Sequence, residues 1–70
     1  MRYLIVIEKT GTGYSAYSPD LDGCVAAGDT REQVEHAMRE AIEFHLDGLR
    51  RDGRPVPPPH ASSTYVDIPA

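Results

Sequence analysis

The sequence predicts an α+β fold of order β-β-β-α-β, in which a small antiparallel sheet packs on one helix. Three observations support this prediction. Short apolar segments separated by turn residues fill the first part of the chain, a helical period of 3.6 residues follows, and a last apolar segment lies near the end. Because 70 residues suffice for one folded unit, we expect residues 1–70 to form a single domain.

Three strands are expected before the helix. The first, RYLIVIEK, is apolar at both its odd and its even positions, which predicts a central strand covered on both faces. TGTG predicts a turn, and GYSAYS a second strand that completes a hairpin. PDLDG predicts another turn, and the short apolar run CVAA predicts the third strand. The first half of the chain therefore indicates an antiparallel sheet.

The helix is expected to begin after Thr30, because Thr30 and Gln33 fit a capping box. Glu32 in the first turn and Arg50 and Arg51 in the last turn suit the helix dipole. On a helical wheel, one face collects the apolar side chains Val34, Ala37, Met38, Ala41, Ile42 and Leu49.

The helix is expected to end at Gly53, because RPVPPP cannot continue it. Residues Gly53 to Pro59 are then a proline-rich extended connector. The segment STYVDI follows, and its apolar residues Tyr65, Val66 and Ile68 predict a fourth strand.

Oligomerisation is expected from apolar surface that one helix and one sheet cannot cover. Phe44 and Leu46 widen the apolar arc of the helix to about 200°, and Leu4 and Val6 give the first strand a second apolar face. We therefore predict a dimer or higher oligomer whose interface includes Phe44, Leu4 and Val6. The alternative is that Phe44 is a partly exposed aromatic residue of an ordinary surface.

Charge, cysteine content and hydropathy argue against a nucleic-acid-binding, a disulfide-bonded and a membrane-spanning protein. The formal net charge is -4 and no basic stripe is present, so direct DNA or RNA binding by this chain is not expected. Cys24 is the only cysteine, which excludes an intrachain disulfide and suits the cytoplasm. No apolar run is long enough to span a membrane.

Four acidic residues are the strongest candidates for a metal site, and they raise the alternative of a metal-dependent nuclease-like enzyme. Asp20, Asp22, Asp29 and Glu8 would serve only if they met at one end of the sheet. DLDG resembles the start of an EF-hand loop, but the twelfth position is Arg31, where that loop requires an acid. The preferred interpretation is that the loop aspartates are turn residues.

Histidine and cysteine give no catalytic arrangement. His36 shares a helical stripe with Glu32 and Glu40, which is typical of a polar surface, whereas His45 lies on the apolar side and is expected to pack. Cys24 begins a short apolar strand, so we expect a buried thiol and not a nucleophile. We therefore predict a non-enzymatic protein without metal or cofactor.

The ordered series YLIVIEK, GYSAYSPDLDGCVAAGDT, EQVEHAMREAIEFHLDGL and DGRPVPPP resembles the HicB-like antitoxin family of bacterial type II toxin–antitoxin systems. The resemblance implies a partial ribonuclease-H-like fold. It also implies a protein that neutralises a HicA-type toxin, a small basic ribonuclease that cleaves messenger RNA. Many such antitoxins carry a C-terminal DNA-binding domain, and this chain is expected to lack one.

Electrostatic complementarity to a basic toxin suggests which residues contact it. The alternatives are that these acids only keep the domain soluble, or that the chain is an orphan structural or ligand-binding module. The expected toxin-contacting residues are Asp20, Asp22, Glu32, Glu40, Glu43 and Asp47.

Overall fold

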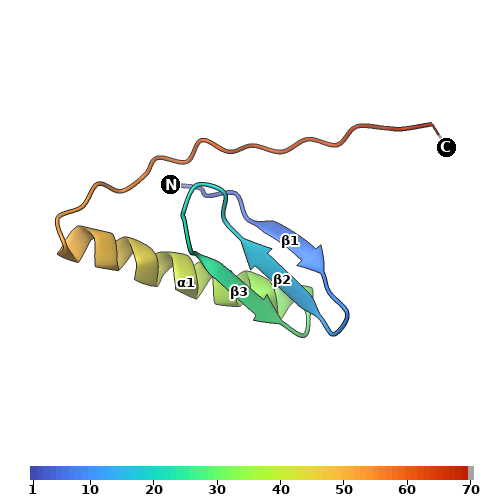
Figure 1. Cartoon of the computed structure of the whole chain (residues 1–70), viewed down its shortest axis with the longest axis horizontal. Coiled ribbons are helices and arrows are strands. Elements are labelled where there is room, and N and C mark those ends of the chain that lie inside the picture. The colour runs from blue at the N-terminus through green and yellow to red at the C-terminus, as the bar shows by residue number, and fades with distance from the viewer. Residues whose placement is uncertain (70) are drawn as a thin grey trace.

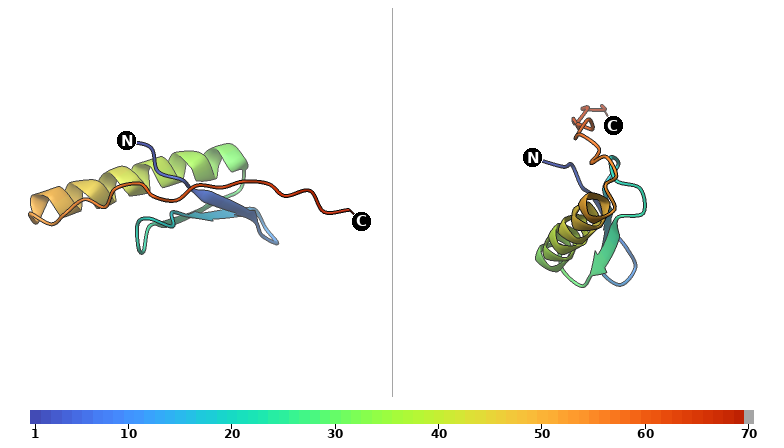
Figure 2. Two further views of the ribbon diagram at one scale, coloured as in Figure 1. Left: turned by 90° about the horizontal axis from the view of Figure 1, so that it is seen from above. Right: turned by 90° about the vertical axis from the view of Figure 1, so that its left-hand side faces the viewer.

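A computed structural model describes residues 1–69 and shows one sheet with one helix across it (Figure 1). The strands are β1 (Val6–Lys9), β2 (Tyr14–Tyr17) and β3 (Val25–Gly28), and the helix α1 spans Arg31–Arg51. The two further views in Figure 2 show that α1 covers a single face of the sheet. The predicted α+β class is confirmed, with three antiparallel strands followed by one helix.

The sheet has the strand order β1-β2-β3, and both pairs are antiparallel. Ile7, Ala16 and Ala26 lie opposite one another across the three strands. They belong to the face that packs on α1, since Ala16 is part of the buried core. The neighbouring row of Val6, Tyr17 and Val25 therefore lies on the open face of the sheet.

Both ends of α1 are fixed by local hydrogen bonds, and the predicted capping box is confirmed. The Thr30 hydroxyl accepts from the Gln33 N–H at 3.1 Å, and the Gln33 side chain accepts from the Thr30 N–H at 3.3 Å. At the other end, the Gly53 N–H donates to the Arg50 carbonyl at 3.1 Å. Gly53 has a φ of 69°, a conformation that glycine adopts without steric cost.

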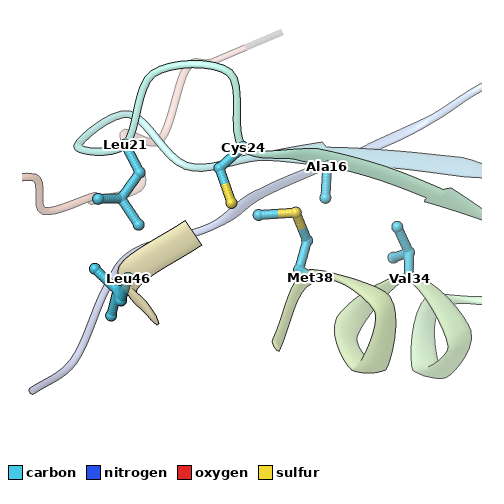
Figure 3. Packing of buried hydrophobic residues seen from close by; sticks show 6 residues of the cluster. All are labelled: Ala16, Leu21, Cys24, Val34, Met38 and Leu46. Carbon is cyan, nitrogen blue, oxygen red and sulfur yellow. The ribbon is translucent and has the colours of Figure 1, made fainter. Parts of the chain in front are cut away.

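The core is small and lies where the loop between β2 and β3 meets the helix. Leu21 and Cys24 contribute from the loop, and their side chains lie over the face of α1 that carries Met38 and Leu46 (Figure 3). Leu21, Met38 and Val34 are the largest fully buried side chains. The predicted turn PDLDG therefore also supplies an apolar anchor. The buried cluster comprises Ala16, Leu21, Cys24, Val34, Met38 and Leu46.

The start of α1 lies very close to the end of β3. A Cβ atom on Gly28 would lie 3.0 Å from the Val34 amide nitrogen, so this position allows little more than glycine. The close approach lets Val34, which is fully buried, cover the sheet directly after the turn.

The predicted fourth strand does not form in this structure, and that prediction is wrong for the chain as described. Residues 62–69 belong to no strand, and Figure 1 shows them running past the sheet without joining it. Consequently β1 is an edge strand, whereas its sequence predicted a central one. The physical reason is that, among residues 1–69, β1 hydrogen-bonds only to β2, which leaves the other edge of β1 unpaired.

We call the extended chain after the helix, residues 53–61, the connector. It has defined hydrogen bonds to the rest of the domain. The Tyr3 hydroxyl donates to the Pro57 carbonyl. One carboxylate oxygen of Asp20 accepts from the backbone N–H groups of both His60 and Ala61, each at 3.1 Å. These bonds hold the connector against the sheet up to Ala61.

Candidate partner-binding surfaces

The loop between β2 and β3 gives its two aspartates different roles. Asp20 is half-buried and fastens the connector through its bonds to His60 and Ala61. Asp22 is exposed and points to solvent from the same turn. Sequence alone treated the two as equivalent acids, because the segment that Asp20 binds lies 40 residues further along the chain.

The four acids considered for a metal site do not meet. Asp20 and Asp22 lie in the loop that joins the end of β2 to the start of β3. Glu8 is near the end of β1 and Asp29 follows the end of β3, which is the opposite end of the sheet given the antiparallel register. Within residues 1–69, no group of three or more His, Cys, Asp and Glu side chains is arranged to hold a metal ion.

The helix acids do form one surface, on the side of α1 that faces away from the sheet. Val34, Met38 and Leu46 are the buried helix residues, and the acids occupy the opposite arc of the wheel. His36 contacts Glu40 at 3.0 Å and Arg50 contacts Asp47 at 3.4 Å. All four acids are exposed, and we call them the acidic stripe: Glu32, Glu40, Glu43 and Asp47.

Phe44 stands beside the acidic stripe and is 81% exposed. It lies one helical turn from Glu40 and from Asp47. Phe44 also lines a groove of about 370 Å³ between α1 and the β3 edge, together with His45 and Val25. An exposed aromatic side chain bordered by acids has the composition of a protein–protein contact, in which a large apolar anchor is surrounded by polar residues.

His45 and Cys24 occupy the positions that the sequence predicted. His45 is half-buried in the groove beside Phe44. Cys24 is buried, and burial raises the pKa of its thiol above the ordinary value. A thiol that stays protonated is a poor nucleophile, so Cys24 behaves as a small apolar core residue.

The residues predicted to form an oligomer interface lie on two different surfaces. Val6 belongs to the open face of the sheet, where its row continues through Tyr17 and Val25, both of which are exposed. Leu4 is half-buried just before β1, and its carbonyl accepts from the Ser18 hydroxyl at 3.1 Å. Phe44 lies on the helix, near the other edge of the sheet. A single contact therefore does not bring all three together.

A larger groove, of about 660 Å³, lies between the free edge of β1 and the helix. We call it the β1 groove. Its apolar lining includes Ile5, Ile7, Met38 and Ile42. Sequence reasoning missed this groove because the residues that line it were assigned to a covered core. Its rim carries four arginines and two glutamates: Arg2, Arg31, Arg39, Arg50, Glu35 and Glu43.

Across residues 1–69, the structure contains no helix with the length and apolar composition needed to cross a membrane.

Residues 3–70 match the family described as HicB-like antitoxin of bacterial toxin–antitoxin system. The chain also resembles a solved structure, the HicA3 and HicB3 toxin–antitoxin complex, with a TM-score of 0.71 and 40% identity. That match covers 84% of this chain and 70% of the solved chain. A crystal structure of antitoxin HicB3 matches with a TM-score of 0.70 and 40% identity, over 81% of this chain and 42% of that one.

Relatives in sequence include a phage protein and a bacterial antitoxin. An uncharacterized 14.9 kDa protein of Haemophilus phage HP1 is 38% identical over 99% of this chain, and antitoxin HicB 2 of Photorhabdus laumondii is 31% identical over the whole of it. The chain spans about half the length of both proteins, 52% and 51%. The match along nearly the whole sequence shows that the chain belongs to the HicB-like antitoxin family of bacterial toxin–antitoxin systems.

Proposed function

We propose that this chain binds and neutralises a HicA-type toxin, an mRNA-cleaving ribonuclease, by protein–protein contact in the cytoplasm. The observation that carries the proposal is the 40% identity to a chain of the solved HicA3–HicB3 complex, together with the shared fold. In this proposal the protein acts by covering the toxin and catalyses no reaction of its own. It requires neither a metal nor a cofactor.

The acidic stripe and Phe44 are the surface that we propose for the toxin. A basic ribonuclease would be attracted to Glu40, Glu43 and Asp47, which steers encounter and sets orientation. Phe44 would supply the apolar contact that holds the complex together, as aromatic anchors do in other interfaces. The exposed acid Asp22 would be a separate contact, because it lies in the loop between β2 and β3 and not on the helix. Asp20 is already bound to the connector.

The nuclease alternative receives no support from the arrangement of the acids. A two-metal or one-metal site needs carboxylates that converge on one point. Here the two loop aspartates and the pair Glu8 and Asp29 lie at opposite ends of the sheet. Binding of a partner is therefore the better use of this acidic surface.

The experiment is a titration of a HicA-type toxin with four-fold neutralised protein, in which Glu32, Glu40 and Glu43 become Gln and Asp47 becomes Asn. We expect the Kd to weaken about tenfold at low salt, mainly through slower association. Folding should persist, since exposed ion pairs such as Arg50–Asp47 contribute about 0–1 kcal/mol. Circular dichroism verifies the helix content of the variant.

The matched control neutralises two acids outside the stripe, Glu8→Gln and Asp29→Asn. It should bind the toxin as the unchanged protein does. Equal affinity of the stripe variant and this control would remove the acidic stripe from the proposed interface. Absence of any complex between the unchanged protein and the toxin, seen by size exclusion, would contradict the proposed function itself.

Phe44→Ser separates the two roles considered for this residue. If Phe44 anchors the toxin, the variant loses toxin affinity while its sedimentation coefficient is unchanged. If Phe44 instead lies between copies of the chain, sedimentation changes. The second result would move Phe44 from the proposed toxin surface to the oligomer interface that its sequence position predicted.

A further inference from the structure

We propose that residues Thr64–Ile68 form a strand that pairs with the free edge of β1 in a second copy of this chain, so that two copies exchange their C-terminal segments. The proposal is independent of toxin binding. It rests on three features of one molecule: an apolar segment with nothing to cover it, an edge strand without a partner, and an apolar groove beside that edge.

The segment after Ala61 has the pattern of a strand but lies in solvent. Val66 is 73% exposed, Ile68 is 75% exposed, and the Tyr65 side chain is fully exposed. The radius of gyration is 13.9 Å, whereas a compact chain of this length has about 11 Å. Apolar side chains at this exposure favour removal from water, so the extended segment is suited to a binding site elsewhere.

The edge of β1 is the matching site. β1 hydrogen-bonds to β2 on one side only, and an open edge is a template for another strand. α1 packs mainly on β3 and β2, so the helix-facing side of β1 is incompletely covered. A strand added beside β1 would direct alternate side chains toward the helix. Val66 and Ile68, two residues apart, would then enter the β1 groove beside Ile5 and Ile7.

The remaining side chains of the segment also fit this placement. Tyr65 and Asp67 would alternate to the open face, where Tyr65 continues the row of Val6, Tyr17 and Val25. With four arginines against two glutamates, the rim of the β1 groove has a basic balance. It suits a segment whose only charged side chain is Asp67 and disfavours a basic partner.

A second copy, and not the same chain, is the donor that the connector favours. Pro57, His60 and Ala61 are held by hydrogen bonds from Tyr3 and to Asp20. Beyond Ala61 the segment runs on past β1 of its own chain without joining it (Figure 1). Proline-rich connectors are extended and stiff, and reciprocal exchange of an end segment forms a closed two-fold dimer at low cost. Exchange also enlarges the small core of a 70-residue chain.

The first test is sedimentation of the full chain and of the double variant Val66→Ser, Ile68→Ser. The unchanged protein should sediment as a dimer and the variant as a monomer. The variant should keep its helix signal in circular dichroism, since both side chains are exposed within one copy. The matched control Val66→Ile, Ile68→Val preserves apolar strand-forming residues and should remain dimeric. A monomeric unchanged protein, or a variant that stays dimeric, would overturn the proposal.

The second test identifies which chain supplies the segment. In a Cys24→Ala background, Glu8→Cys on the open face of β1 and Asp67→Cys on the segment are joined with a short thiol cross-linker. Exchange between copies gives a covalent dimer on a denaturing gel. A cross-linked monomer would show that the segment binds its own β1, which contradicts the exchange. The same protein with Glu8→Cys alone serves as control and should give neither product.

Discussion

At the scale of single residues, Thr30 decides where the helix begins. Its side chain accepts from Gln33, and its own N–H is satisfied by the Gln33 side chain. Thr30→Ala removes half of this box and should lower the free energy of unfolding by about 1 kcal/mol. Urea unfolding followed at 222 nm measures the loss. Thr12→Ala, at an exposed turn position, is the control and should be nearly neutral; an equal effect of both would exclude the cap as the cause.

Cys24 gives a pH dependence at the same scale. Burial raises the pKa of its thiol in the folded state, so the folded chain holds this proton to a higher pH than the unfolded chain does. Its contribution is therefore constant at neutral pH and is lost as the pH rises above about 8.5. Unfolding at pH 7, 8 and 9.5 should show a steeper decline for the unchanged protein than for Cys24→Ala. Parallel declines would contradict this assignment.

At the scale of elements, Gly53 sets the end of α1 and the direction of the connector. Its φ of 69° costs a residue with a side chain about 1–2 kcal/mol. Gly53→Ala should therefore lower the free energy of unfolding by about 1 kcal/mol. Gly11→Ala is a fair comparison, because an added Cβ there meets no atom within 4 Å. Equal stability of Gly53→Ala and the unchanged protein in thermal denaturation would show that the helix can end without this turn.

The end of the connector, at His60 and Ala61, is held by the carboxylate of Asp20. Asp20→Ala removes the acceptor of the His60 and Ala61 N–H groups. We expect both amides to exchange their hydrogens at least about tenfold faster, because each lost bond is worth about 1 kcal/mol or more. Asp22→Ala, an exposed neighbour, should leave these amides unchanged. If Asp20→Ala also leaves them unchanged in an NMR exchange experiment, Asp20 does not hold the connector.

At the scale of the whole molecule, the exchanged dimer predicts that stability depends on concentration. Folding coupled to association gains free energy by mass action, so a hundredfold higher protein concentration should raise the Tm by about 5 °C or more. Calorimetry at two concentrations measures the change. Val66→Ser, Ile68→Ser should show no such shift, and a Tm of the unchanged protein that is independent of concentration would contradict the dimer.

The local part of the fold was predictable because it depends on neighbouring residues. The capping box needs only Thr30 and Gln33, and the glycine stop needs only Gly53, so both follow from spacing. The strand positions follow equally from alternation and turn residues, although β1 begins later than its apolar pattern suggested. The burial of Cys24 was also expected, from the apolar run that it begins.

The sequence by itself determined the α+β class, the helix with its caps, the acidic balance and the family resemblance, all of which depend on order and spacing along the chain. Only the tertiary structure decided that Asp20 holds the connector, that the acids near the two ends of the sheet stay apart, and that β1 is an edge. These outcomes depend on contacts between residues far apart in the chain, for which no periodicity exists. The apolar patterns of β1 and of Tyr65–Ile68 each predict a strand. Whether the two strands pair, and whether they do so within one chain or between two copies, depends on the folded assembly.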